Sequence, residues 1–234
     1  MEKVIYLLWR RPGEEPLAWA AAQRRRLAEL RRLAGVRSLR LNLQDDAVQS
    51  AGALRRASSP NPPDALLQVW LDSAIAQRRA PLDIALARDG TKFSAYLVCE
   101  SQPLLNRRHP PAAGARTTGF AQIALLKRPP RLTPAQWLDT WQNSHTEIAI
   151  QTQSTFEYLQ NLVVRALSAE APAYDAFVEE CFPQAAISDP QKFFDAPGDP
   201  EQFQRNLDRM MSSVQRFIDM DRLDVLITSQ YCVD

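Results

Sequence analysis

The chain repeats one local pattern at a constant spacing of 118 residues. An apolar run that ends in arginine and proline occupies residues 6–12 and recurs at residues 124–130. A tryptophan follows each copy at the same distance, as Trp19 and Trp137, and 137 − 19 again gives 118. Because a match of this kind without a gap is improbable by chance, the sequence predicts two copies of one structural unit.

Both halves show the same succession of strand and helix patterns. Short runs of β-branched, aromatic and leucine residues indicate strands, and apolar residues at helical spacing indicate helices. The first half has predicted strands at 3–9, 36–43, 66–71 and 93–99, and helices at 15–34 and 73–86. The second half has predicted strands at 120–126, 156–164, 174–181 and 223–232, and helices at 134–153 and 201–218. Each half therefore has the order β-α-β-β-α-β.

This order predicts an α+β fold made of tandem ferredoxin-like repeats. A four-stranded sheet with helices on one face leaves its other face uncovered, and two such faces can close a barrel within one chain. We expect a degenerate first half at residues 1–105, a linker at 106–118 and a second half at 119–234. The barrel interior is a natural place for a ligand cavity. Further pairing of chains into a homodimer stays open.

Composition excludes several classes of function. The formal charge of +1 and a pI of about 7.7 give no electrostatic argument for binding nucleic acid or an anionic membrane. No apolar run is long enough to span a bilayer, and three cysteines without a CxxC pair are typical of reduced thiols. Phosphate-binding glycine loops, serine-nucleophile turns and clustered metal ligands are absent from the sequence. We expect a cytoplasmic protein that acts on a small molecule.

One predicted helix carries the residues best suited to chemistry. Trp137, Trp141 and His145 are spaced four residues apart and therefore share a face. His145 could transfer a proton in an aromatic-lined cavity, or it could be an ordinary histidine packed between helix and sheet. Both interpretations stay open at this point.

The following strand offers polar groups that could complete a site. Tyr158 and Gln160 fall on one face of this strand, while Asn161 falls on the other. The first two could hydrogen-bond a substrate carbonyl, or they could be ordinary polar strand residues. Arg128 ends the preceding strand, where it could bind a carboxylate or be an exposed turn cation.

The second half resembles the EthD domain family. The resemblance is carried by residues 126–134, by Trp137, Trp141 and His145 on one helix, and by the Tyr-Leu-Gln-Asn element at 158–161. It covers residues 119–234 well and residues 1–105 as a worn copy, where Leu27 stands in place of His145. The His-Thr-Glu sequence that begins at His145 departs from the family pattern. The resemblance implies a dimeric α/β-barrel fold with one site per chain.

Three functional hypotheses follow from these residues and this resemblance. In the first, the protein is a cofactor-free lyase, isomerase, cyclase or monooxygenase-like enzyme for a small carbonyl or aromatic compound. His145 would be its acid or base, and Tyr158 or Gln160 would polarise an oxygen, with Trp137, Trp141, Asn161 and Arg128 binding the substrate. In the second, His145 is the axial ligand of a haem. In the third, the protein binds a small molecule or serves as a scaffold without catalysis.

Overall fold

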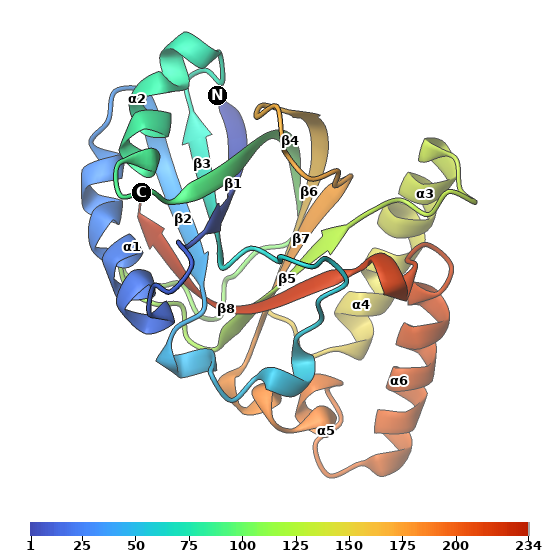
Figure 1. Cartoon of the computed structure of the whole chain (residues 1–234). Helices are drawn as coiled ribbons and strands as arrows, with labels where there is room; N and C mark the ends of the chain where they lie inside the picture. Colours follow the sequence, from blue (N-terminus) through green and yellow to red (C-terminus); the bar gives the residue numbers. More distant parts are fainter. Residues whose placement is uncertain (234) are drawn as a thin grey trace.

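Eight antiparallel strands close a barrel in the computed structural model, which describes residues 1–233 (Figure 1). Around the barrel the strands follow the order β1-β3-β2-β8-β5-β7-β6-β4. Their bounds are β1 Glu2–Trp9, β2 Val36–Leu43, β3 Ala65–Leu71, β4 Lys92–Leu104, β5 Phe120–Leu126, β6 Glu157–Ala166, β7 Ala176–Phe182 and β8 Asp224–Val233.

The helices form two layers on opposite sides of the barrel (Figure 1). The first half contributes α1 (Pro16–Arg31) and α2 (Ala76–Ala87). The second half contributes α3 (Pro134–Thr140), a π-helical turn η3 (Trp141–His145), α4 (Thr146–Thr152), a short α5 (Pro190–Phe193) and α6 (Pro200–Val214). Short 3₁₀ turns are η1 (Asp46–Val48), η2 (Gly52–Leu54), η4 (Gln184–Ile187) and η5 (Met220–Arg222).

The predicted fold class is confirmed, since both halves have the main order β-α-β-β-α-β and their sheets join in one barrel. The halves meet where β2 pairs with β8 and where β4 pairs with β6. β4 continues to Leu104, well past the predicted end at residue 99, because its last residues pair with β6 of the other half. A common origin of the halves and the boundary between them stay predictions, as does a homodimer.

Local sequence signals explain where the elements of the second half begin. Thr133 and Gln136 form a capping box at the start of α3, and Pro134 occupies the first helical turn. Gly119 has a φ of 101° directly before β5, and a Cβ there would lie 2.0 Å from the carbonyl oxygen of Phe182. Only glycine fits so close to this neighbouring strand.

Side chains fill the centre of the barrel, where the sequence suggested a cavity. One end is apolar and includes Ile5, Leu7, Tyr96 and Phe177. The other end holds a buried polar network, which is described below with the candidate site. A remaining space of about 530 Å³ lies at the polar end, between the strands and residues 102–113. No helix within residues 1–233 has the length and apolar character needed to cross a bilayer.

Candidate active site

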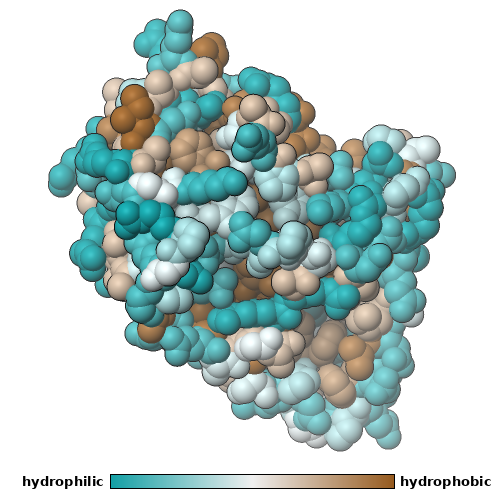
Figure 2. Space-filling model, viewed as in Figure 1, coloured by the Kyte–Doolittle hydropathy of each residue, from teal (hydrophilic) through white to brown (hydrophobic). Residues whose placement is uncertain are grey.

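The most apolar of the larger cavities lies outside the barrel, between the sheet and the helices of the second half. It has a volume of about 490 Å³ and is lined by residues of β5 to β8, η3 and α6 together with the segment around α5. Residues 53–56 of the first half complete its wall. Figure 2 shows apolar surface in a recess beside α6 on this side of the molecule.

Three polar side chains form a row on the sheet face of this cavity. In the antiparallel registers, Glu180 on β7 stands opposite Gln122 on β5 and opposite Tyr158 on β6. All three line the cavity. Directly opposed residues of neighbouring strands lie on the same face of a sheet, so the three side chains point together toward the helices.

Glu180 is a buried carboxyl group with little solvation from the protein. Its exposed fraction is 5%, and its one hydrogen bond comes from Gln122 Nε2, which donates to Oε2 over 3.2 Å. The other oxygen, Oε1, has no hydrogen-bond partner among residues 1–233. Burial raises the pKa of Glu180 to about 7, against the effect of the Gln122 hydrogen bond. A carboxyl group with such a pKa can both accept and donate a proton near neutral pH.

His145 faces the same cavity from the helix layer. Its exposed fraction is 4%, and its ring lies 4.5 Å from the ring of Phe217 between centroids. Nδ1 is 3.0 Å from Ser213 Oγ on α6. Burial, together with the nearby Arg216, lowers the pKa of His145 to about 4. The imidazole is therefore neutral at physiological pH.

The contacts of Ser213 indicate which ring nitrogen of His145 carries the proton. Arg216 donates a hydrogen bond to Ser213 Oγ over 3.1 Å. This leaves the Ser213 hydroxyl proton available for Nδ1 of His145. We assign the proton of the neutral ring to Nε2 on this basis. No hydrogen bond within residues 1–233 uses Nε2, so this N–H is a free donor.

The π-helical turn η3 sets the position of His145 on its helix. Both the backbone N–H and the side-chain hydroxyl of Thr146 bond to the carbonyl oxygen of Trp141, the hydroxyl over 2.9 Å. Gln160 Nε2 donates to Thr146 Oγ1 over 2.7 Å and so ties the turn to β6. A single π turn inserts one residue into the helical register, and such turns often occur at functional sites.

Tyr158 supplies a hydroxyl group to the floor of the cavity. Its oxygen accepts a hydrogen bond of 3.3 Å from Nε1 of Trp141. Burial, reinforced by the Glu180 carboxylate, raises the pKa of Tyr158 well above its usual value, so the phenol stays protonated. The side chains of Gln160 and Thr146 also interact with this hydroxyl, which lies at the floor of the cavity.

The structure brings together only part of the residue set expected from the sequence. Trp141, His145 and Tyr158 line the cavity. Trp137 and Gln160 lie behind it, where their side chains donate to Phe217 O and to Thr146 Oγ1.

Two other expected residues lie elsewhere. Arg128 is bound at the turn after β5, where its backbone N–H donates to Asp175 and its guanidinium donates to the carbonyl of Leu132. Asn161 is directed away from the helices, as strand alternation predicts, and donates to the carbonyl of Phe177. Neither lines the cavity.

Sequence reasoning missed Glu180, although a signal was present. Glu179 and Glu180 are consecutive in a strand that is otherwise apolar. Because consecutive strand residues point to opposite faces, one of them had to face the helices and the other the barrel. A carboxyl group buried under a helix layer indicates either a buried ion pair or a functional group.

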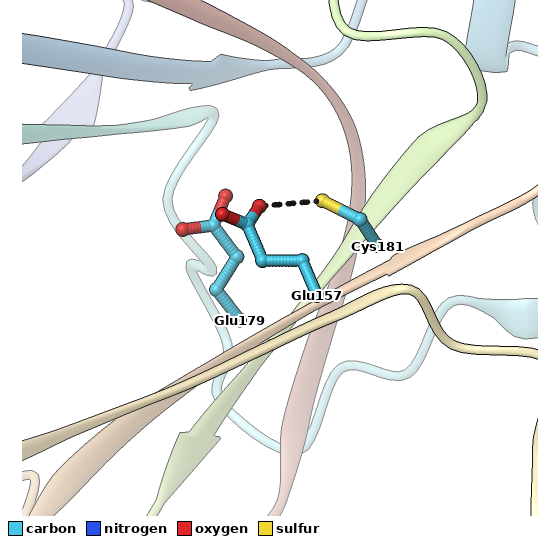
Figure 3. A group of neighbouring side chains, drawn as sticks. All are labelled: Glu157, Glu179 and Cys181. Carbon is cyan, nitrogen blue, oxygen red and sulfur yellow. Dashed lines mark hydrogen bonds between the residues drawn. The ribbon is translucent and has the colours of Figure 1, made fainter. Parts of the chain in front are cut away.

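The barrel interior contains a second group of ionisable residues. Glu157, Glu179 and Cys181 are close enough for their ligand atoms to lie within 4.8 Å of one another (Figure 3). Arg40 already bonds both carboxylates, over 3.2 Å to Glu157 and 3.0 Å to Glu179. Cys181 donates its thiol proton to Glu157, and burial raises its pKa far above the usual value.

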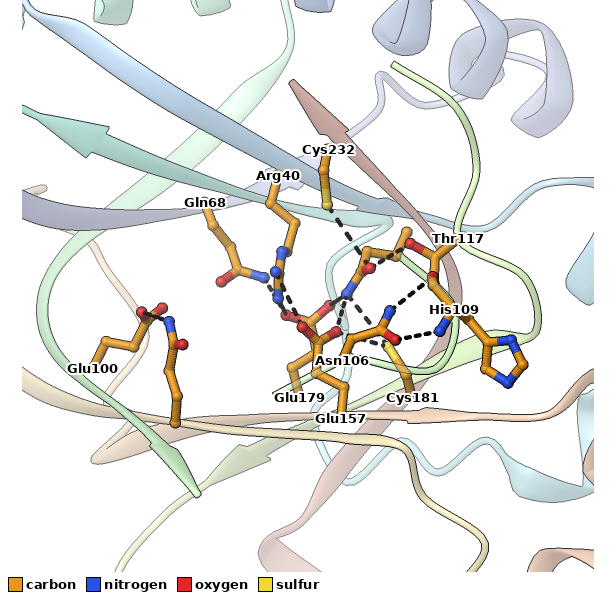
Figure 4. Close-up of polar contacts among 12 residues, drawn as sticks. Arg40, Gln68, Glu100, Asn106, His109, Thr117, Glu157, Glu179, Cys181 and Cys232 are labelled. Atoms are coloured by element: carbon orange, nitrogen blue, oxygen red, sulfur yellow. Dashed lines mark hydrogen bonds and ion pairs between the residues drawn. The ribbon is translucent and has the colours of Figure 1, made fainter. Parts of the chain in front are cut away.

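Other side chains of the barrel interior, among them Gln68, donate further hydrogen bonds to Glu179 (Figure 4). Glu179 accepts from Asn42, Gln68 and Gln230 in addition to Arg40, over 2.6 to 3.0 Å. A divalent cation would have to displace these donors and the guanidinium charge. The residues therefore fit an internal polar network better than a metal centre.

Comparisons with known proteins support the fold and one part of the sequence resemblance. The family model of the EthD domain matches residues 129–221, a segment that runs from before α3 to η5 and contains both His145 and Glu180. No curated protein matches the chain.

Two solved structures are similar over the full length of the chain. One is an anthrone oxidase-like protein, with 10% identity, a TM-score of 0.57, and coverage of 100% of this chain and 92% of its own. The other is a proposed monooxygenase from Fusobacterium nucleatum, with 8% identity, a TM-score of 0.51, and coverage of 100% and 92%. At these identities the likeness supports the shared fold alone.

Proposed function

We propose that the cavity between sheet and helices binds a small carbonyl or aromatic compound, and that Glu180 transfers a proton at a carbon next to its carbonyl group. The observation that carries the proposal is a buried carboxyl group with a pKa of about 7 and one oxygen free, in a cavity with apolar walls. The cavity volume of about 490 Å³ suits a molecule of two or three fused rings.

The chemistry assigns a role to each group that lines the cavity. The ionised Glu180 takes a proton from the carbon, and negative charge moves to the substrate oxygen. The Tyr158 O–H and the His145 Nε2–H are donors at the cavity that can stabilise this oxygen by hydrogen bonds. Return of the proton from Glu180 to another carbon would complete an isomerisation. In a cyclisation, the carbanion would attack a second carbonyl carbon of the same molecule, and Glu180 would return the proton to the alkoxide oxygen that forms.

The proposal changes the role that the sequence suggested for His145. A base with a pKa of about 4 is weak, whereas efficient proton transfer near neutral pH needs a group with a pKa near 7. Glu180 meets this condition and His145 does not. His145 therefore acts as a neutral donor, much as Tyr158 does.

Exchange of substrate hydrogen for deuterium tests the proposal directly. Anthrone, 2-tetralone and 1-indanone carry acidic C–H groups next to or conjugated with a carbonyl, and they can be incubated without oxygen in deuterated buffer. We expect the protein to accelerate exchange for at least one of them. Glu180→Gln should reduce that acceleration by about 10²- to 10⁴-fold. Exchange is followed by mass spectrometry.

The matched control replaces an exposed glutamate, Glu170→Gln, and should exchange as fast as the wild-type protein. A wild-type protein that accelerates none of the three exchanges, or a Glu180→Gln variant that remains as fast, would contradict the proposal. Binding of these compounds without exchange would instead support the non-catalytic alternative.

The two similar structures suggest a second candidate, because one is an anthrone oxidase-like protein and the other a proposed monooxygenase. A carbanion formed by Glu180 could react with O₂. The methylene carbon would lose two hydrogens and gain one oxygen atom as a carbonyl, and the second oxygen atom would leave as water. Oxygen uptake that depends on Glu180 and yields anthraquinone from anthrone would favour this candidate.

A haem remains the third candidate, because a neutral imidazole is the form that binds iron. Binding through Nε2 would require the other neutral tautomer of His145, in which Nδ1–H donates to Ser213 Oγ. The side chains that would hold the group are His145, as a ligand of the iron, and the apolar residues of α6 that line the cavity. Addition of haemin should then give a Soret band that His145→Leu abolishes and Glu180→Gln retains. Failure of the wild-type protein to bind haemin would remove this candidate.

A further inference from the structure

A segment of the first half forms part of the wall of the cavity in the second half. Residues 53–56 lie at the end of η2 and line the cavity. The segment is anchored by Val48 and Ala51, which are fully buried in a cluster with Phe120, Phe182 and other residues of the second half. Its position relative to the cavity is therefore fixed by packing across the two halves.

A backbone bridge fixes the end of this segment beside β8. The N–H of Arg56 donates to the carbonyl of Val225 over 3.1 Å, and the N–H of Val225 donates to the carbonyl of Arg56 over 2.8 Å. Val225 itself lines the cavity. The bridge therefore holds the backbone of Arg55 and Arg56 at the cavity wall.

Both arginines bring a positive charge that no carboxylate of the described chain neutralises. The guanidinium of Arg55 donates to the carbonyl of Val48 over 2.9 Å, and that of Arg56 donates to the carbonyl of Met220 over 2.7 Å. Neither forms an ion pair within residues 1–233. Other exposed arginines, such as Arg37 and Arg88, are paired with Asp72 and Glu29.

The other charges at the cavity do not cancel this pair. Asp189 is the remaining carboxylate in the wall besides Glu180. It caps α5 by accepting from two backbone N–H groups and also pairs with Lys192 over 3.4 Å. The charge of Asp189 is therefore compensated by the N–H groups of α5 and by Lys192, and not by Arg55 or Arg56. The wall contributed by residues 53–56 remains positive, while the floor around Glu180 is weakly charged.

We propose that Arg55 and Arg56 bind an anionic group, a carboxylate, carried by the substrate at the end that lies away from Glu180. This inference rests on the proposed function, since it assigns the class of compound that the same cavity takes. A guanidinium binds a carboxylate through paired N–H donors, and such a group at an exposed rim raises affinity without contact with the reacting carbon. The substrate would then be a small aromatic or carbonyl-bearing acid.

A matched pair of ligands tests the inference without any turnover. 9-Fluorenone-2-carboxylate and 9-fluorenone-2-carboxamide have the same rings and nearly the same size, and only the first is charged. Isothermal titration calorimetry at low ionic strength should show that the wild-type protein binds the carboxylate on the order of tenfold more tightly. Added salt should reduce this preference.

Four variants locate the effect. The double variant Arg55→Gln with Arg56→Gln should lose the preference while binding the carboxamide unchanged, and each single variant should lose part of it. Arg25→Gln, an exposed helix arginine remote from the cavity, should keep the preference. A double variant that still prefers the carboxylate, or a wild-type protein that binds neither ligand or both equally, would overturn the inference.

The result is separable from that of the proposed function. Glu180→Gln should keep the preference for the carboxylate, because the arginines are independent of the proton-transferring group. Loss of hydrogen exchange with retained preference supports both proposals. Retained exchange in Glu180→Gln together with a wild-type preference for the carboxylate contradicts the proton-transfer role alone.

Discussion

Two neighbouring carboxyl groups on β7 show how differently the two faces of this sheet are built. Glu179 points into the barrel, where four side chains donate hydrogen bonds to it. Glu180 points toward the helices, where Gln122 is its single donor among residues 1–233 and one of its oxygens has no partner in this part of the chain. Both are almost completely buried. Burial is therefore similar in the two groups. Hydrogen bonds from the protein replace the lost water contacts of Glu179 much more fully than those of Glu180.

The difference in solvation gives the two groups opposite pKa shifts. Burial alone would raise the pKa of Glu179, but Arg40 and three amide side chains lower it below the usual value. For Glu180 burial prevails and the pKa rises to about 7. The barrel interior therefore holds a permanent charge that joins strands, whereas the cavity holds a group that changes charge near neutrality. We assign stability to the first and reactivity to the second.

The same contrast separates the helix-covered faces of the two halves. Each half has a row of three cross-strand partners at matching positions under its helices. The first half fills its helix layer with a continuous apolar core that includes Leu27, while the second half leaves a cavity beside His145. In the first half the row is apolar and consists of Val4, Val69 and Leu39. In the second half it is polar and consists of Gln122, Glu180 and Tyr158.

The largest expected effect on stability comes from removing the positive charge of Arg40, which pairs with both Glu179 and Glu157. Arg40→Met leaves two buried carboxylates without their cation, which should lower the free energy of unfolding by about 3–5 kcal/mol. Urea denaturation measures the loss. Arg37→Met, on the same strand, breaks only an exposed pair with Asp72 and should cost at most about 1 kcal/mol. Equal losses in the two variants would show that the barrel network is not stabilised by this charge.

Glu180 should make the protein less stable as the pH rises. Its folded pKa of about 7 exceeds the ordinary value of 4.5, so between these values the unfolded chain has lost a proton that the folded chain retains. The stability that the protonated group contributes is complete below about pH 4.5 and is lost as the pH passes 7. Glu180→Gln should therefore gain stability relative to the wild-type protein across this window, by roughly 2–3 kcal/mol.

Glu179 provides the opposite slope as a control for the same measurement. Its pKa is lowered, so its contribution is present above the ordinary value and disappears as the pH falls through the folded value. Glu179→Gln should thus be least stable relative to the wild-type protein at neutral pH. If the two variants showed the same dependence on pH, the contrast between the faces of β7 would be lost.

The fold was largely predictable from the sequence because its signals are local. The apolar runs, the Thr133–Pro134 helix start and the repeat spacing predicted the order of the main elements and the closed barrel. The length of β4 was not predictable, because its end is determined by pairing with β6 of the other half. Such pairing between distant segments leaves no periodic pattern in the strand itself.

The site was only partly predictable, for a related reason. Trp141, His145 and Tyr158 were found because spacing along one helix or strand placed them together. The row of Gln122, Glu180 and Tyr158 depends on the register of three strands, which a single sequence does not give. The location of the cavity also depended on packing, since side chains fill the centre of the barrel and leave space at its polar end, whereas the helix layer of the second half is not filled.

The smallest effect concerns the π turn that directs His145. Thr146→Val keeps the shape of the side chain but removes the hydroxyl that donates to Trp141 O and accepts from Gln160. The free energy of unfolding should fall by about 1–2 kcal/mol, because one hydrogen bond is lost and the Gln160 amide is left without its acceptor. Thermal or urea unfolding gives this value.

A second threonine of the same helix shows whether the π turn matters beyond stability. Thr152 donates to the carbonyl of Ile148 over 2.7 Å, so Thr152→Val also removes one buried hydroxyl but leaves η3 intact. We expect both variants to be destabilised, and only Thr146→Val to shift the His145 ring resonances in NMR spectra and to slow hydrogen exchange in the substrate. His145 resonances that stay unchanged in Thr146→Val would mean that packing against Phe217 and Ser213 alone positions the imidazole. Contacts within the helix layer would then be enough to position the histidine. Only the polar row of Gln122, Glu180 and Tyr158 would depend on the register of the strands.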